Sequence, residues 1–313
     1  MSVSVVIPTR DRAAGLRSTL DALARQHPPK GGFEVVVVRD QNDRQTANVL
    51  KRHSASTDIV AVDTNGEGPA AARNAGVERA KGELVLFLGD DTAPLRDDFV
   101  LRHAELHADR PPTYAVLGQV VWDESKHAPT PFMRWLGESG IQFAFDWLVA
   151  GPVPASRHFY CANVSLKRDL LRAVGGFDER FPYAAVEDVE LGARLDEAGV
   201  ELDYHPELVV AHDHPTTLAT SLDRVERVGQ SAALYGTVHP ERPHPDLRPP
   251  AGLGWKLLVA VRPLLRGASR LPLPRTLRRG VWRLLHLSAY GNGHRLGPPS
   301  QLRMRQTSSA PDA

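Results

Sequence analysis

The chain has 313 residues, and its 38 lysines and arginines nearly balance 37 aspartates and glutamates, which gives a formal net charge of +1. With 42% hydrophobic and 24% charged residues, the composition is that of a globular protein and excludes a fibrous or disordered chain. The single cysteine, Cys161, excludes an internal disulfide and a cysteine-based zinc site, so we expect a reducing, cytoplasmic environment. The near-zero net charge argues against a general nucleic-acid binder.

The first ninety residues alternate between strand and helix patterns. Short apolar runs rich in β-branched residues predict four strands, over residues 3–7, 33–38, 59–62 and 84–88. Helical periodicity predicts three helices between them, over residues 12–26, 47–52 and 69–80. This order predicts an α/β fold with a doubly wound, mostly parallel sheet and helices on both faces.

The remaining chain is less regular. Residues 115–122, 163–166, 200–204 and 208–211 read as strands, and residues 99–107, 168–174, 189–198 and 218–234 read as helices. The segment 126–154, rich in proline, glycine and aromatic residues, is expected to be a loop over a substrate. Trp122, Trp135 and Trp147 are either a platform for an acceptor sugar ring or part of the packing of the second half of the sheet, and for Trp122 packing is favoured. The apolar stretches are too short or too charged to span a bilayer, and the first residues lack the pattern of a signal peptide.

Polar residues directly follow three of the apolar strands, at residues 8–10, 39–40 and 89–91. Open α/β sheets bind ligands at the carboxyl ends of their strands, so this pattern predicts a binding site there. Asp90 and Asp91 are adjacent carboxylates that repel each other, and a divalent cation bound to substrate phosphates would compensate their negative charge. The alternative is an acidic turn at the surface without a bound ion.

Two further groups carry candidate chemistry. Glu187 and Asp188 stand at a predicted helix start, where they either stabilise the helix dipole or supply a general base and orient an acceptor hydroxyl. His212 and His214 follow a strand and share one face by alternation, as metal ligands or as solvated side chains of a turn.

Asp40 and Arg73 also allow two interpretations. The Asp40 carboxylate could accept hydrogen bonds from a nucleobase or a ribose, or it could cap the next helix. Arg73 follows a glycine-containing loop, where it could meet a phosphate or form an ordinary ion pair.

Together these segments resemble the family 2 glycosyltransferases. The similarity extends over about residues 3–235 and rests on seven segments in the family's order: VVIPTRDR, FEVVVVRDQND, GPAAARNAG, ELVLFLGDDTAP, NVSLKRDLLRAVGGFDERF, EDVELGARLDEAG and VVAHDHP. The resemblance implies a GT-A fold and an inverting, nucleotide-sugar-dependent transferase, in polysaccharide or glycoconjugate biosynthesis.

The resemblance implies a nucleotide-sugar site at the first strand ends. The residues it assigns to that site are Pro8, Thr9, Arg10, Asp40, Arg73, Asn74 and Asp90. Asp40 matches the carboxylate that contacts the base, usually uracil, which makes a UDP-sugar the expected donor. The family's usual Asp-Asp-Gly-Ser is replaced here by residues 39–42, Arg-Asp-Gln-Asn, so the base specificity is less well defined than the fold.

The resemblance also implies the catalytic residues. Asp91 matches the metal ligand at the end of the DxD motif, and Gly89 stands where the first aspartate is often found. The ion would be Mg²⁺ or Mn²⁺, held with the help of His212 or, less favoured, His214. Asp188 matches the catalytic base within a Glu-Asp pair. The acceptor could be a sugar, a lipid-linked molecule or a small molecule.

Two other functions fit parts of the pattern. A catalytically degenerate protein that binds nucleotides or glycans would keep the fold, although the intact Asp91 and Asp188 argue against it. A sugar nucleotidyltransferase of related fold should carry a glycine-rich basic loop after the first strand, which residues 8–10 do not resemble. A retaining transferase of the same fold is a further alternative.

The C-terminal part changes in character after a proline-rich joint at residues 240–250. We expect a catalytic domain over residues 1–245, with a nucleotide-binding half (1–92) and an acceptor half (93–245), and a basic, proline-interrupted amphipathic tail over 246–313 that is disordered from residue 306. This helical appendage interleaves arginines with leucines and tryptophans, which allows two interpretations. It could bind an anionic membrane surface, which would make the protein peripheral at the inner face of the membrane, or it could pack on the catalytic domain with its arginines solvated.

Overall fold

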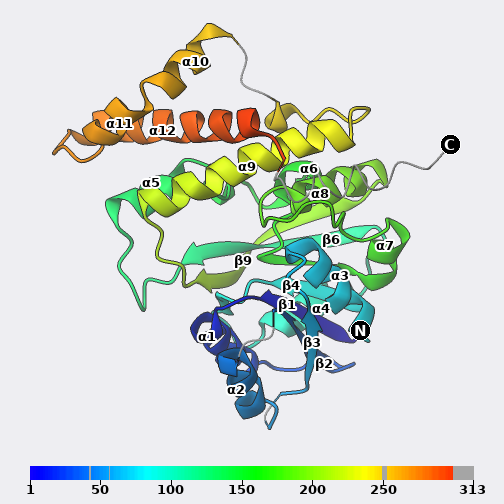
Figure 1. Cartoon of the computed structure of the whole chain (residues 1–313). Helices are drawn as coiled ribbons and strands as arrows, with labels where there is room; N and C mark the ends of the chain where they lie inside the picture. The colour runs from blue at the N-terminus through cyan, green and yellow to red at the C-terminus, as the bar shows by residue number, and fades with distance from the viewer. Residues whose placement is uncertain (42–43, 56, 249–251, 299–313) are drawn as a thin grey trace. The chain divides into compact units, whose positions relative to one another are not determined.

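The computed structural model describes residues 1–41, 44–55, 57–248 and 252–298. The chain forms two compact units, Met1–Pro215 and Thr216–Ala313 (Figure 1). The end of the catalytic domain at residue 245 stays a prediction.

The first half of the first unit follows the predicted alternation. Four parallel strands lie in the order β3-β2-β1-β4, and their bounds are β1 Val3–Thr9, β2 Phe33–Asp40, β3 Ile59–Thr64 and β4 Leu84–Leu88. The helices between them are α1 Ala13–Leu23, α2 Arg44–His53 and α3 Pro69–Arg79. The central valines and leucines of β1, β2 and β4 are fully buried, as expected of strands covered on both faces.

The second half extends the same sheet in the order β4-β8-β6-β9-β5, with β7 paired to β9. Its strands are β5 Thr92–Pro94, β6 Tyr114–Trp122, β7 Gly151–Val153, β8 Asn163–Lys167 and β9 Glu201–His212. Its helices are α4 Phe99–Leu106, α5 Pro131–Glu138, α6 Ala155–His158, α7 Arg168–Ala173 and α8 Glu187–Glu197. The α/β class is confirmed, but the sheet is mixed, because β8 is antiparallel to β4 and β6, and β5 and β7 are antiparallel to β9.

Strand β9 is one strand where the sequence predicted two. Pro206 lacks the backbone N–H that strand pairing requires. The strand continues because the register between β6 and β9 shifts between Gly118 and Gln119, which leaves the chain around Pro206 as a bulge outside the pairing with β6. Asn163 donates to the carbonyls of Leu208 (2.8 Å) and Gln119 (3.1 Å) at this bulge. The uninterrupted strand carries His212 to the site.

The segment 126–154 is folded rather than a plain loop. It contains α5, whose first turn is capped by the Thr130 side chain accepting from the Met133 N–H, and the short 3₁₀ helix η1 over Phe145–Trp147. Trp135 is buried on α5, so it is not an accessible part of an acceptor platform.

The second unit is helical. Its elements are α9 Leu218–Val238, the 3₁₀ turn η2 Pro245–Leu247, α10 Leu253–Ala260, α11 Arg262–Ala268 and α12 Arg275–Leu296. α9 and α12 approach closely at two glycines: a Cβ on Gly229 would lie 2.2 Å from the Tyr290 carbonyl oxygen, and one on Gly293 would lie 1.9 Å from that of Glu226. In the described part of the chain no helix is both long and apolar enough to cross a bilayer. The predicted disorder from residue 306 lies outside the described residues.

Candidate active site

The turn after β4 holds two buried carboxylates. The Thr9 hydroxyl at the end of β1 donates to Asp90 Oδ2 (2.8 Å), and the Thr19 hydroxyl donates to the Asp90 carbonyl (3.0 Å). The Asp91 carbonyl accepts from the backbone N–H of Asp213, just beyond β9 (2.8 Å). These bonds fix the turn between the ends of strands that are far apart in sequence.

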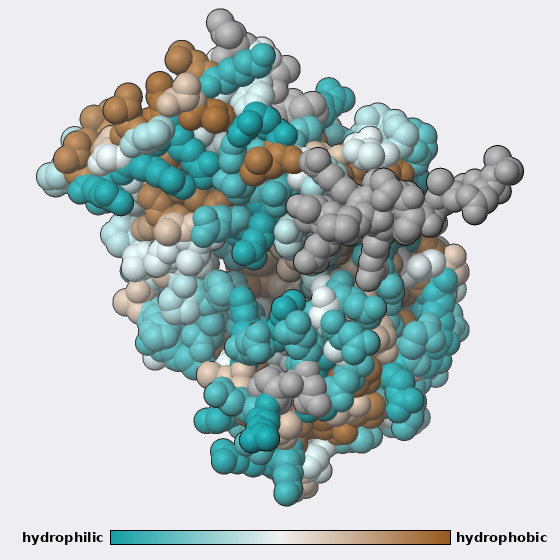
Figure 2. Space-filling model, in the orientation of Figure 1, coloured by the Kyte–Doolittle hydropathy of each residue, from teal (hydrophilic) through white to brown (hydrophobic). Residues whose placement is uncertain are grey.

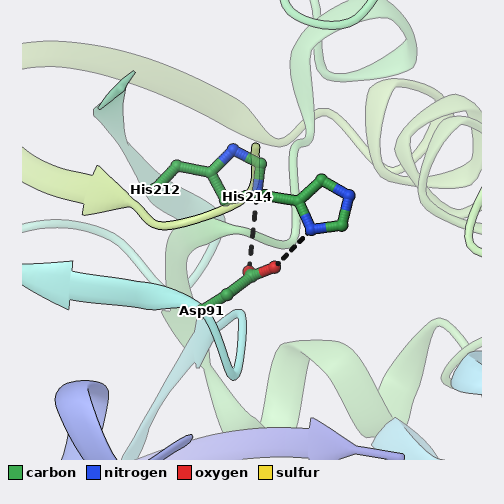
Figure 3. A group of neighbouring side chains, drawn as sticks. All are labelled: Asp91, His212 and His214. Carbon is green, nitrogen blue, oxygen red and sulfur yellow. Dashed lines mark ion pairs between the residues drawn. The ribbon is translucent and has the colours of Figure 1, made fainter. Parts of the chain in front are cut away.

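Asp91, His212 and His214 form a three-residue cluster (Figure 3). His212 Nε2 lies 3.4 Å from Asp91 Oδ1, and His214 Nδ1 lies 3.3 Å from Oδ2. One potential ligand atom from each residue lies within 4.8 Å of the others. As alternation predicted, both imidazoles face the same way, while Asp213 between them pairs with Lys126 Nζ (2.6 Å).

The His212 ring is held from two sides. Trp122 at the end of β6 stacks on it, with ring centroids 5.6 Å apart and planes 19° apart. Phe143 meets it edge-on at 6.3 Å. This aromatic support limits the rotation of a ring whose nitrogen must face Asp91.

Arg12 also contacts the acidic pair, and sequence reasoning missed it. Its guanidinium touches Asp91 Oδ2 and lies 3.6 Å from Asp90 Oδ1. Burial alone would raise the pKa of Asp91, but His212, His214 and the charge of Arg12 outweigh it and hold that pKa well below its ordinary value. Burial and the neighbouring Asp91 carboxylate raise the pKa of Asp90.

A second group of polar residues lies at the adjacent ends of β1 and β2. Asp40 is buried, and its carboxylate accepts from the Thr64 hydroxyl (2.8 Å) and from the Gly68 N–H (3.3 Å). Arg10 Nη1 lies 3.8 Å from Asp40 Oδ2, and Pro8 is in register with Val38 of β2. The structure thus brings Pro8, Arg10 and Asp40 together beside Thr9, which contacts Asp90.

Arg73 and Asn74 make contacts within the chain that the sequence did not reveal. Arg73 Nη1 donates to Glu187 Oε1 (2.8 Å), and both side chains are buried; the second Glu187 oxygen accepts from the Ala185 N–H (2.7 Å). The Asn74 amide exchanges hydrogen bonds with the backbone of Phe177. These contacts fix the start of α8 and the turn before it.

Asp188 occupies the first turn of α8 and is half-buried, and its Oδ1 accepts from the Val189 N–H (2.9 Å). Cys161 interacts electrostatically with Asp188, and burial raises the pKa of its thiol. The carbonyl of the next residue, Ala162, accepts from the Thr92 hydroxyl (3.3 Å), directly after Asp91. The acidic turn thus contacts the chain just before β8, and Asp188 at the start of α8 is near enough to the same segment for an electrostatic interaction.

A cavity of about 600 Å³ opens beside the cluster. His212, Trp122 and Phe143 line it, together with polar side chains that include Gln119, Glu138 and Asp146. Trp122 is thus part of a cavity wall, whereas Trp135 and Trp147 are not among its lining residues.

Comparison with known proteins decides the family. Residues 4–162 match the family described as glycosyl transferase family 2, which is half of the chain. The chain belongs to this family. The pre-mycofactocin glycosyltransferase of Mycobacterium tuberculosis is 32% identical to this family 2 member over 78% of this chain and 49% of that protein. The validoxylamine A glucosyltransferase of Streptomyces hygroscopicus subsp. jinggangensis is 33% identical over 64% of this chain and 52% of its own. The chain spans about half the length of these curated relatives.

Solved structures share the fold of this family 2 member. A mannosyltransferase from Pyrobaculum calidifontis, in complex with GDP-Man and Mn²⁺, superposes with a TM-score of 0.56 at 18% identity, covering 97% of this chain and 83% of that one. Residues 1–349 of S. aureus TarS, in complex with UDP-GlcNAc, give 0.51 at 14% identity, covering 98% and 92%. These similarities confirm the predicted GT-A fold.

Proposed function

We propose that the protein transfers a sugar from a nucleoside-diphosphate sugar to an acceptor hydroxyl, with inversion at the anomeric carbon. The observation that carries the proposal is the Asp91, His212 and His214 cluster beside Asp90, at the strand ends where GT-A folds bind ligands. The curated relatives are named glycosyltransferases, and two structural neighbours hold nucleotide sugars.

The cluster has the chemistry of a divalent metal site. A carboxylate and two imidazoles suit Mn²⁺ better than Mg²⁺, which prefers oxygen ligands throughout. Asp91, His212 and His214 would hold the ion, which when bound neutralises the charge of the leaving diphosphate. The mannosyltransferase neighbour is described with Mn²⁺.

The polar group at the ends of β1 and β2 is the proposed nucleotide site. The Asp40 carboxylate, positioned by Thr64 and Gly68, would accept a hydrogen bond from a base N–H, which uracil offers. Asp90, positioned by Thr9, would accept from a ribose hydroxyl. Arg10 is half-exposed beside Asp40 and could contact a phosphate. We propose a UDP-sugar as the donor.

Asp188 is the proposed general base. Its carboxylate would take the proton of the acceptor hydroxyl while that oxygen bonds to the anomeric carbon and the bond from that carbon to the diphosphate breaks. Glu187, neutralised by Arg73, would position the helix start instead of contacting the acceptor. Attack from the face opposite the leaving group gives the inverted product.

The cavity beside His212 is the proposed acceptor site. Trp122 and Phe143 offer aromatic faces to a sugar ring, and Gln119 offers hydrogen bonds to hydroxyls. Its volume of about 600 Å³ suits a small molecule or the end of a larger glycan.

A donor screen tests the proposal. The protein is incubated with Mn²⁺ and a panel of nucleotide sugars, and released nucleoside diphosphate is measured. We expect release from one donor, abolished by Asp91→Asn and retained by Asp97→Asn, which changes an exposed carboxylate outside the site. Tight nucleotide binding without release from any donor would contradict the proposal and favour a binding protein. Pyrophosphate release from a sugar phosphate and a nucleoside triphosphate would instead indicate a nucleotidyltransferase.

A further inference from the structure

The helices α10, α11 and α12 expose an unusual number of leucines. Of the ten large hydrophobic side chains exposed in the described chain, six lie on these helices and a seventh, Leu271, lies between α11 and α12; the six are Leu257, Leu264, Leu277, Leu284, Leu287 and Leu296. Leu264 is 74% exposed and Leu257 is 64% exposed. In Figure 2 hydrophobic residues gather over α10 and α11. A surface patch of this kind marks an interaction site.

These leucines are separate from the core of the helical unit. On α12, helical periodicity places Leu277, Leu284 and Leu287 on one side, away from the buried Trp282 and Leu285. The buried side belongs to the close packing of α9 against α12 at Gly229 and Gly293. The exposed leucine stripe therefore contributes nothing to the packing of this pair.

The same segment is strongly basic. Residues 252–298 contain nine lysines and arginines and no aspartate or glutamate. Within the described chain Arg262 pairs with Glu226 (3.0 Å), while the exposed Arg266, Arg270 and Arg283 form no ion pair. The leucines are thus flanked by uncompensated positive charge.

We propose that α10–α12 bind the surface of an anionic lipid bilayer. The leucines would enter the boundary between headgroups and acyl chains, and the arginines would pair with lipid phosphates. Charge complementarity selects this partner over a second copy of the chain, because two such surfaces would bring their positive charges together. This surface belongs to the helical unit, whereas the residues of the proposed donor and acceptor sites belong to the first unit.

Vesicle sedimentation of the full chain tests the proposal. We expect binding to vesicles of phosphatidylcholine mixed with phosphatidylglycerol, weak binding to phosphatidylcholine alone, and a loss of binding as salt is raised. Equal sedimentation with both vesicles, or with neither, would overturn it. Nucleotide-sugar turnover is not part of this readout, so failure here and failure of the proposed transferase activity are distinguishable.

Two variants separate the contributions of charge and leucine. Arg266→Gln/Arg270→Gln/Arg283→Gln should weaken binding to anionic vesicles on the order of a hundredfold, since each arginine near such a surface contributes about fivefold. Leu264→Gln/Leu271→Gln/Leu277→Gln should weaken it at least about tenfold. The control Arg52→Gln/Arg79→Gln/Arg172→Gln removes the same charge from exposed positions of the first unit and should bind as the wild type. Equal loss in the control, or a lipid-free dimer that only the leucine variant dissociates, would contradict membrane recognition by α10–α12.

Discussion

At Asp91 the Arg12 guanidinium and the His214 imidazole contact the same carboxylate oxygen, Oδ2. A divalent ion bound by Asp91 and the histidines would meet the positive charge of Arg12 a few ångströms away. The arrangement implies that Arg12 neutralises the acidic pair in the nucleotide-free protein and competes with the ion for it. A donor diphosphate would give the guanidinium another anion to contact.

Removal of Arg12 should therefore tighten metal binding in the absence of nucleotide. We expect Arg12→Gln to lower the Kd for Mn²⁺ at least about tenfold, since the repulsion between a divalent ion and a unit charge about 4 Å away is about 2 kcal/mol even in water. Mn²⁺ titration followed by electron paramagnetic resonance measures this directly. Arg17→Gln, an exposed change on α1, should leave the Kd unchanged. An unaltered or weaker affinity in Arg12→Gln would show that Arg12 does not compete with the ion.

The limits of sequence reasoning are visible at these residues. The common face of His212 and His214 could be predicted, because alternation in an extended chain is a local property. The contacts Arg12–Asp91 and Arg73–Glu187 could not, since they join residues 79 and 114 positions apart and depend on which strands become neighbours. No local pattern distinguishes either arginine from a solvated one.

Among the elements, α4 and its C-cap residue carry an unusual pair of buried histidines, His103 and His107. The His103 and His107 rings both contact the Ser165 hydroxyl of β8, at 2.8 and 2.9 Å, and neither ring is exposed to solvent. Burial is the main cause that lowers the pKa of each histidine to about 3, and the neighbouring His205 lowers both values further.

This pair predicts a loss of stability in acid. Because both folded-state pKa values lie below the unfolded value of about 6.5, the unfolded chain binds more protons as the pH falls from about 6.5 towards 3. In this pH range each histidine should lower the free energy of unfolding by about 1.4 kcal/mol for every unit by which the pH falls. Above about pH 6.5 the two histidines should have no such effect. Urea unfolding at several pH values measures the slope. The variant His103→Asn should show a shallower slope, and His127→Asn, at an exposed position, should keep the wild-type slope. Equal slopes in all three proteins would contradict the assignment.

The α9–α12 pair makes a second prediction at the scale of elements. Gly293→Ala would place a Cβ against the Glu226 carbonyl oxygen, so the helices must separate, and we expect a loss of about 1–3 kcal/mol. Gly280→Ala, in open space on the same helix, should instead stabilise it by up to about 1 kcal/mol. Chemical denaturation of the full chain compares the two variants. A neutral Gly293→Ala would mean that α9 and α12 do not pack as described.

For the molecule as a whole, the two halves of the sheet differ in how well the sequence predicts them. The first four strands and three helices were predicted, because parallel strands buried on both faces give continuous apolar runs separated by helical periodicity. The antiparallel strands β5 and β7 have three residues each, too few for a pattern, and the bulge at Gly118 hides the continuity of β9.

The central claim is that the carboxylate at the start of α8 removes the proton of the acceptor hydroxyl. Asp188→Asn keeps the size of the side chain and removes its basicity, so we expect donor affinity within about twofold of the wild type. We expect the rate of sugar transfer, once the donor screen has supplied a substrate, to fall by a factor of about 10²–10⁴. Glu197→Gln, at the other end of α8, provides the control. The measurement is single-turnover transfer at saturating donor. Transfer by Asp188→Asn at the wild-type rate would contradict the account.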